Sequence, residues 1–401
     1  MGTKQRSPLM VIFLTVFIDL LGFGIVLPLL PRYAEKFQAS DMTLGMLMAS
    51  FSAMQFLFSP LWGRLSDRIG RRPVLLIGLC GSAVFYTVFG YATAIASLPL
   101  IFASRVAAGI AGATISTAQA FIADSTPPDE RGKGMAIIGA AFGIGFTFGP
   151  LLGSFWVSDA PGTTPSPAPG YVAGALSLAA FCFAFVALPE SLRPDSLPAE
   201  RHWFNMRSLR ASLQIPTMVL LIVTFFIATF AFANFESTLT RLTKSTGFDF
   251  SDRDNFYIFA YVGLVLSLAQ GFLVRRMLPI IGEVWMVTVG SVLMAAGMFG
   301  IGASAARQSS AMLLGCLPVA VVGFACLTPS LQALVSRRSA ASIQGEMLGV
   351  VQSASSLARI LGPVCGNLLF GFGTTHGIPY FFGAGVMGTV VVLSLGLARG
   401  N

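Results

Sequence analysis

The sequence is poor in charged residues, and this shortage excludes a soluble fold. Only 10% of its 401 residues are charged, whereas 55% are hydrophobic and Phe alone occupies 35 positions. A soluble domain needs more polar surface than this to cover an apolar core. The chain is therefore expected to place much of its apolar surface in lipid.

Residues that carry out chemistry are also scarce. There are two histidines, His202 and His376, both in predicted loops, and five cysteines without metal-ligand spacing. The sequence has no nucleophile–base constellation, no zinc-binding helix and no phosphate-binding loop. We therefore expect no metal site, no cofactor and no enzymatic activity, and we interpret the cysteines as small packing residues.

Apolar runs that can cross a bilayer, which takes about 20 helical residues, recur along the whole chain. The first run is too long for a cleavable signal peptide and has no small-residue cleavage site. The sequence predicts an all-α integral membrane protein with twelve transmembrane helices, at residues 9–32, 43–63, 73–93, 97–121, 134–157, 170–189, 215–237, 252–273, 284–305, 309–335, 344–371 and 377–398.

The basic residues are distributed unevenly over the predicted loops. Most of the 25 Lys and Arg residues lie on the side that carries the N-terminus, and this asymmetry predicts that both termini are cytoplasmic. The net charge of +8 then reflects topology, so we expect a lipid bilayer and no nucleic acid as partner.

The two halves of the chain repeat each other. A shift of 213 residues, and slightly smaller shifts of 209 and 208 near the start of each half, align polar and small residues of the first half with the same residue types in the second. Each half has six predicted spans, so the halves enter the membrane from the same side. We predict two six-helix bundles related by a pseudo-twofold axis, at 1–190 and 215–401, joined by a cytoplasmic linker at 191–214. The matched positions are Gln119 with Gln332, Gly149 and Pro150 with Gly362 and Pro363, Arg32 with Arg241, and Gly63 with Gly271.

Three motifs connect this pattern to a known family. They are "GRLSDRIGRRP" at 63–73, "RVAAGIAGA" from Arg105, and "GIGFTFGPLLGS" at 143–154. With these motifs the chain resembles the major facilitator superfamily, and within it the twelve-helix drug:proton antiporters that include bacterial tetracycline efflux proteins. The resemblance implies a secondary transporter of a small organic substrate that exchanges protons by alternating access. It also implies a multi-pass protein of the bacterial inner membrane, which we expect to be monomeric.

The charged loop between the second and third spans is the first candidate site. Its arginines can be simple cytoplasmic anchors, but this does not explain the aspartate among them. The resemblance implies a cytoplasmic gate, in which Asp67 meets the start of the eleventh span near 342–345 and Asp124 pairs with a loop arginine. The second half lacks an acid before the matching glycine, which predicts one complete latch. The gate residues are Gly63, Asp67, Arg68, Gly70, Arg71, Arg72 and Asp124.

Asp19 is the second candidate, because it lies roughly 16 Å along the first span, near mid-bilayer. A charged aspartate at that depth costs roughly 2.5–3.5 kcal/mol on insertion scales, so it should face a cavity or a partner. We predict that Asp19 couples transport to protons; the alternatives are a structural ion pair or a substrate-binding anion. Arg105 lies at a comparable depth, and the resemblance implies that it tunes proton binding; the alternative is a packing cation.

A third group of residues predicts a substrate cavity and a close helix contact. Large aromatic residues and few charges favour an amphipathic or lipophilic compound. Amides can also merely bridge helices, and Arg359 can either bind an anionic substrate group or pair with an acid. Glu236 is expected to be solvated, with binding of substrate or cations as the alternative. The cavity candidates are Phe23, Gln55, Gln119, Asn234, Gln332 and Arg359, and the fifth-span signature is Gly145, Gly149, Pro150 and Gly153, whose fourfold glycine spacing favours close packing.

Three function classes remain open at this point. The first is a proton-driven exporter of amphipathic or lipophilic compounds, and the second is a facilitative or proton-symporting carrier of a metabolite such as an organic anion. The third is a membrane-embedded enzyme or receptor, for which the sequence has no supporting motif. The chain departs from tetracycline carriers, which have an acid where Phe85 stands in the third span and another in the ninth span, where this sequence has none. These departures speak against metal-chelated tetracycline as the substrate.

Overall fold

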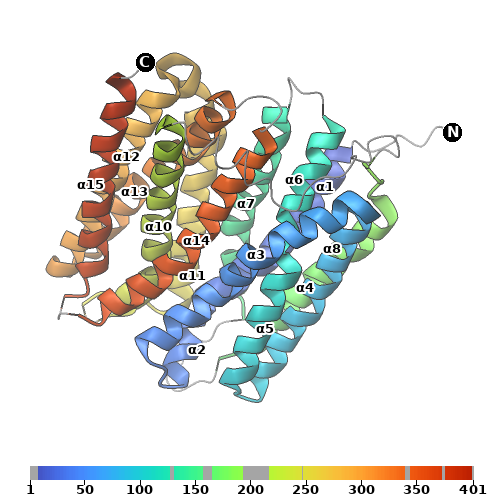
Figure 1. Cartoon of the computed structure of the whole chain (residues 1–401). Helices are drawn as coiled ribbons and strands as arrows, with labels where there is room; N and C mark the ends of the chain where they lie inside the picture. The colour runs from blue at the N-terminus through green and yellow to red at the C-terminus, as the bar shows by residue number, and fades with distance from the viewer. Residues whose placement is uncertain are drawn as a thin grey trace. The chain divides into compact units, whose positions relative to one another are not determined.

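The computed structural model describes residues 8–126, 131–156, 165–192, 216–245, 247–338, 344–372 and 375–399, and every regular element in these ranges is helical (Figure 1). The expectation of an all-α membrane protein is confirmed. Among the described residues, nine helical runs are long and apolar enough to cross a membrane, and one of them, Asp252–Arg307, has 56 residues and covers two predicted spans. Each of the twelve predicted spans overlaps a helix.

The first half contains interrupted as well as continuous helices. The first span is broken by a 3-10 turn that contains a proline, and the fourth by a second 3-10 turn. Pro150 lies inside α7, where a proline removes a backbone hydrogen bond. The elements are α1 (Pro8–Val26), η1 (Leu27–Leu29), α2 (Leu30–Lys36), α3 (Asp41–Ile69), α4 (Arg71–Ala94), α5 (Leu98–Ala111), η2 (Gly112–Thr114), α6 (Ile115–Ser125), α7 (Arg131–Ser154) and α8 (Ala168–Ala187).

The second half has one long run that bends inside. Gly282 has φ 77° and ψ 162°, which interrupts α12 between two helical parts. The elements are α10 (Pro216–Lys244), α11 (Asp252–Leu268), the π-helix η4 (Ala269–Val274), α12 (Arg275–Arg307), α13 (Ser310–Arg338), α14 (Gln344–Phe370) and α15 (Ile378–Arg399).

Helix packing repeats between the halves. In the first half α1 packs against α7 and α8, and α4 packs against α5 and α8. In the second half α10 packs against α14 and α15, and α12 packs against α13 and α15. These are the same partners in the order that the sequence repeat predicts, so the repeated pattern produces a repeated bundle.

The chain divides into two compact units, and each contains one short segment from the other half. Unit 1 comprises residues 1–38, 50–200 and 252–264, and unit 2 comprises 39–49, 201–251 and 265–401. In unit 2, Gly45 of α3 lies against the backbone of Val364 in α14. In unit 1, Gly263 of α11 lies against Phe146 of α7. The domain boundaries at 1–190, 191–214 and 215–401 stay a prediction.

Glycines allow α1 and α7 to approach closely in unit 1. A methyl group on Gly149 would lie 2.8 Å from Cα of Gly24, and one on Gly145 would lie 2.9 Å from Cβ of Leu20. Real side chains do not tolerate such distances without movement, so glycine sets the helix separation here. Gly153, one turn further along α7, faces the ring of Phe256 in α11.

Candidate functional site: charged residues within and at the ends of the helices

Asp19 lies in the middle of α1 and is partly buried. Its carboxylate accepts a hydrogen bond of 3.1 Å from Oγ of Ser177 in α8, and it also interacts with Ser82 of α4. Hydroxyl donors of this kind lower the cost of an anion away from water without neutralising it. Asp19 therefore has polar contacts but no formal counter-charge among the residues that the structure describes.

Arg105 of α5 is 2% exposed and packs between aromatic rings. Its guanidinium carbon lies 4.6 Å from the ring centroid of Phe51 and 5.7 Å from that of Phe23. Within the described ranges, its Nε and Nη1 atoms have no hydrogen-bond partner, and it forms no ion pair with Asp19. The predicted tuning of Asp19 by Arg105 stays a prediction, and in this structure it does not act through direct pairing.

Tyr86 of α4 lies near both charged residues. It is 3% exposed, and both Asp19 and Arg105 lie within electrostatic range of its hydroxyl group. Its ring also lies beside Gly22 of α1. Sequence analysis did not single out Tyr86, because one aromatic residue in an apolar helix carries no pattern that distinguishes it from a packing residue.

Three of the predicted cavity amides differ in their surroundings. Nε2 of Gln55 donates to the carbonyl of Gly112 at 3.2 Å and thereby links α3 to the turn after α5. Asn234 is 1% exposed, and its Nδ2 donates to the carbonyl of Pro379 at 3.1 Å, which links α10 to α15. Gln332 has an exposed side chain.

Two further cavity candidates, Gln119 and Phe23, lie in unit 1. Gln119 is partly buried in α6. Phe23 packs against Phe51 and Phe146, with ring centroids 5.0 and 5.8 Å away. The substrate contacts of all these residues stay predictions.

Arg359 of α14 has an acidic neighbour that the sequence did not indicate. Glu236 of α10 lies close enough to interact electrostatically with it. Glu236 is partly buried rather than solvated, because it lies within the candidate span Thr217–Lys244. Unit 2 thus holds an acid and a base inside its helices, as unit 1 does.

The charged loop between α3 and α4 contains the ion pair that the resemblance implied. Nε of Arg71 lies 3.1 Å from Oδ2 of Asp124, and its Nη1 donates to Oγ of Ser66 at 2.7 Å. Arg72 donates to the carbonyl of Phe185 at 2.6 Å. Gly63 accepts a bond from Ser66, and Arg68 is exposed. The side chain of Asp67 and residues 339–343 lie outside the described part, so the predicted gate stays a prediction.

Glu190 stabilises the start of α4, and sequence analysis missed it. Its carboxylate accepts the backbone N–H groups of Arg71 and Arg72 at 2.9 and 3.2 Å. Gly70 precedes them with φ 103°, and any larger side chain there would collide with Glu190. A carboxylate at a helix start satisfies unpaired N–H groups and the helix dipole. No local signal predicts this contact, because its partners are more than 100 residues apart in sequence.

The second half carries the same turn and ion pair with exchanged charges. Gly282 has φ 77° and ψ 162°, close to the 103° and 157° of Gly70. The residue after it, Glu283, lies 3.1 Å from Nη1 of Arg337 at the end of α13. Carboxylate and guanidinium have thus changed places relative to Arg71 and Asp124. Glu283 follows the glycine and does not replace the acid that the second loop lacks before it, so the expectation of one complete latch stays a prediction.

Two further ion pairs join residues from different halves of the sequence. In unit 1, Nε of Arg32 lies 3.0 Å from Oδ2 of Asp252, with 11% and 16% of the side chains exposed. In unit 2, Nη2 of Arg241 lies 2.5 Å from Oδ1 of Asp41. Arg32 and Arg241 occupy matched positions of the repeat, and Asp41 and Asp252 are the first residues of the corresponding helices α3 and α11, so the two pairs are reciprocal.

Comparison with known proteins extends these observations over the whole chain. The family model of the Major Facilitator Superfamily matches residues 12–363. The tetracycline resistance protein, class E, of Escherichia coli is 30% identical, and the match covers 91% of this chain and 88% of that protein. The major facilitator superfamily domain-containing protein 10 of Mus musculus is also 30% identical, over 90% and 86%.

A further relative and two solved structures agree with this match. Multidrug resistance protein 2 of Bacillus subtilis is 28% identical, over 98% of this chain and 95% of that protein. The crystal structure of the human organic anion transporter MFSD10 is similar with a TM-score of 0.75 and 26% identity, over 98% and 100% of the two chains. The D-xylose-proton symporter shares the fold, with a TM-score of 0.79 and 18% identity over 97% and 96%. The family match over most of the chain, together with the repeated bundles and the charged helix-end turns, shows that this protein belongs to the Major Facilitator Superfamily of membrane transporters.

Proposed function

We propose that this protein is a proton-coupled antiporter that exports amphipathic or lipophilic organic compounds by alternating access. The observation that carries the proposal is Asp19, an acid in the middle of a membrane helix that contacts hydroxyl groups instead of a cation. Both termini are cytoplasmic in this proposal, as the distribution of basic residues predicts.

The contacts of Asp19 suit a group that gains and loses a proton. A salt bridge would hold the carboxylate ionised, whereas Ser177 supplies a hydroxyl that donates to the anion and accepts from the neutral acid. An ionised aspartate at this depth costs roughly 2.5–3.5 kcal/mol, and protonation removes that cost. Protonation of Asp19 therefore changes the environment that α1 favours. This change couples proton binding to the conformational change of alternating access.

The surroundings favour a lipophilic substrate. Phe23, Phe51 and Phe146 form an aromatic group beside the buried cation Arg105. Aromatic walls with few polar groups bind amphipathic organic molecules through apolar contact. Relatives named for tetracycline and multidrug resistance support export of such compounds.

A second function has a specific observation in its favour. Arg105 is buried with unpartnered Nε and Nη1 atoms among the described residues, and a ligand carboxylate or sulfonate would satisfy them. Arg359 is a second cation within a helix. A structurally similar protein is a human organic anion transporter. This alternative is a carrier of organic anions.

The deciding experiment measures proton and substrate movement in proteoliposomes with a trapped pH dye. Ethidium serves as the lipophilic cation and fluorescein as the organic anion, each tested with wild type, Asp19→Asn and Glu236→Gln. Glu236→Gln is the matched control, because it removes the acid of the other unit. Proton release triggered by ethidium in wild type and Glu236→Gln, and lost in Asp19→Asn, is the result we expect.

Other outcomes would replace the proposal. Ethidium flux that survives Asp19→Asn and ignores the pH gradient would refute proton coupling through Asp19. Fluorescein flux that is lost in Arg359→Gln, without ethidium flux in wild type, would establish the organic anion carrier instead.

A further inference from the structure

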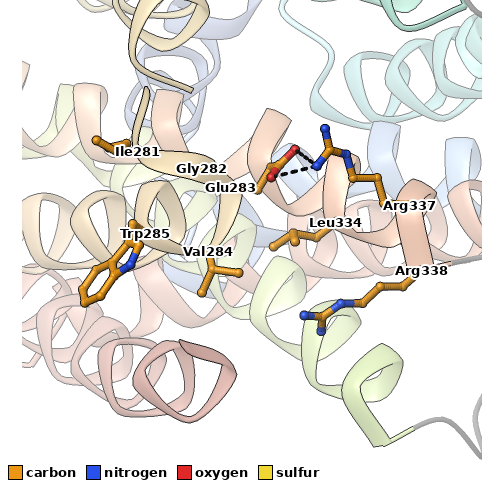
Figure 2. Close-up of a pocket in the computed structure, with 8 residues that line it drawn as sticks. All are labelled: Ile281, Gly282, Glu283, Val284, Trp285, Leu334, Arg337 and Arg338. Carbon is orange, nitrogen blue, oxygen red and sulfur yellow. Dashed lines mark hydrogen bonds and ion pairs between the residues drawn. The ribbon is translucent and has the colours of Figure 1, made fainter. Parts of the chain in front are cut away.

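A cavity of about 370 Å³ lies in unit 2 beside the bend of α12 (Figure 2). Gly282, Glu283 and Trp285 line it from α12, and Arg337 and Arg338 line it from the end of α13. None of these residues belongs to the proposed proton-coupling or substrate-binding residues. The cavity therefore calls for its own explanation.

The charged residues that line the cavity are two arginines and one glutamate. Glu283 is its one acidic lining residue, and both of its contacts with Arg337, at 3.1 and 3.4 Å, use the same nitrogen, Nη1. Nε and Nη2 of Arg337 make no hydrogen bond within the described part of the chain, and 73% of this side chain is exposed. Figure 2 shows Arg337 turned toward Glu283, with Arg338 coming from the same helix end. An anion in the cavity thus meets a guanidinium with donors to spare.

The first half shows what occupies the equivalent place there. At the Gly70 turn, the carboxylate of Glu190 accepts the N–H groups of Arg71 and Arg72 at the start of α4. At the Gly282 turn the matching helix start borders the open cavity, and nothing lies within 4 Å of where a Cβ on Gly282 would stand. The repeat therefore indicates that an anion can bind at this helix start in the second half, where the cavity leaves room for it.

The cavity lies where the helices leave the apolar layer, and this position favours a lipid as its ligand. Arg337 and Arg338 directly follow the candidate span Ser310–Val335, so they lie where a helix leaves the apolar layer. Trp285 is 55% exposed, and tryptophan is enriched at the membrane–water interface. Ile280 and Phe272, on the same stretch of α12 and η4, are 71% and 74% exposed and offer apolar surface for acyl chains.

From this combination we propose that the cavity at the Gly282 bend binds the phosphate group of an anionic membrane lipid, with Arg337 and Arg338 contacting the phosphate and Trp285 lying beside the glycerol region. Basic pockets between membrane helices recognise lipid head groups in this way. Guanidinium groups donate paired hydrogen bonds to phosphate oxygens. In a zwitterionic lipid the cation of the head group partly neutralises the phosphate, so the cavity should prefer an anionic lipid. The inference does not depend on the proposed transport function.

The test counts bound lipids on the whole protein by native mass spectrometry, with phosphatidylglycerol and phosphatidylcholine of the same acyl chains. The variant Arg337→Gln/Arg338→Gln is compared with Arg275→Gln/Arg276→Gln, which removes the same charge from exposed positions outside the cavity lining. We expect one tight phosphatidylglycerol in wild type, bound roughly 30-fold more weakly in the cavity variant and unchanged in the control.

A second variant keeps the test independent of folding. Glu283→Gln removes the carboxylate that competes for Arg337, so we expect it to bind phosphatidylglycerol more tightly than wild type, a gain that misfolding does not produce. Equal losses in the cavity and control variants, or equal binding of both lipids, would overturn the proposal. Displacement of the lipid by millimolar glycerol phosphate would assign the site to a soluble phosphate and overturn the lipid as well.

Discussion

The two ion pairs at the helix-start turns have the same distance but different exposure, which predicts different energies. Arg71 and Asp124 are 3.1 Å apart with 9% and 30% of their side chains exposed, whereas Glu283 and Arg337 are 3.1 Å apart with 15% and 73% exposed. We therefore compare Arg71→Gln with Arg337→Gln. Each variant removes the guanidinium of its own pair, although the two arginines stand at exchanged positions of the repeat.

The magnitudes follow from what each variant leaves behind. Arg71→Gln leaves Asp124 without its cation and Ser66, which is fully buried, without its 2.7 Å contact. Breaking a buried pair costs about 3–5 kcal/mol, and the partial exposure of Asp124 reduces this to about 2–3 kcal/mol. Arg337→Gln affects an exposed pair, and such pairs contribute about 0.2–1 kcal/mol.

The assay is reversible unfolding in mixed micelles with increasing dodecyl sulfate, followed by circular dichroism. Arg71→Lys serves as the control that keeps the charge but loses the fork geometry. High salt should weaken the contribution of Arg337 and leave that of Arg71 nearly unchanged, because buried charges are screened less. Equal destabilisation by the two Gln variants, or a larger loss for Arg337→Gln, would refute the argument from burial.

Two further predictions concern helix packing and the pairs between the halves. Gly149→Ala pushes a methyl group against the backbone of Gly24, so we expect it to lower the free energy of unfolding by about 1–3 kcal/mol in the same assay. Gly385→Ala is the control, because nothing lies within 4 Å of its added methyl group, and it should change the stability little. Similar effects of both variants would contradict the close approach of α1 and α7. Arg241→Lys keeps the charge beside Asp41 but not the planar donor group, so its melting temperature should fall between wild type and Arg241→Gln, and a value equal to wild type would show that charge alone suffices.

Hydropathy located the helices but not their ends. The second span was predicted to end at residue 63, yet α3 continues to Ile69, because the charged residues after Gly63 remain helical outside the apolar layer. Apolar composition indicates where a helix can meet lipid, whereas its end depends on turns and capping groups. Here the turn is Gly70 and the capping group is Glu190, far away in sequence.

Sequence analysis identified the charged residues of the site because such residues are rare in these helices, but it did not identify the residues that they contact. Asp19 and Arg105 stand out because acids and bases are few in these helices. Tyr86 and Glu283 did not stand out, the first because aromatic residues are common in this chain. Glu283 was missed because the second loop has more residues between its two glycines, so the repeat shift changes from 208 at Gly271, which lies inside the π-helix η4, to 212 at Gly282.

The reciprocal pairs carry a consequence for how such a protein can arise and diverge. Arg32 with Asp252 and Arg241 with Asp41 place an arginine and an aspartate at the same two positions of each half. A homodimer of a single half would form both bridges with one arginine and one aspartate per copy, so the bridges are compatible with a duplicated ancestor. Reversing the sign of one bridging residue alone would bring like charges together, so a bridge can exchange its charges only through changes in both halves, whereas a pair such as Arg71 with Asp124 can exchange them within one half. After duplication, a change of polarity in a bridge thus requires the two halves to diverge together, while the pairs within one half can change independently of the other.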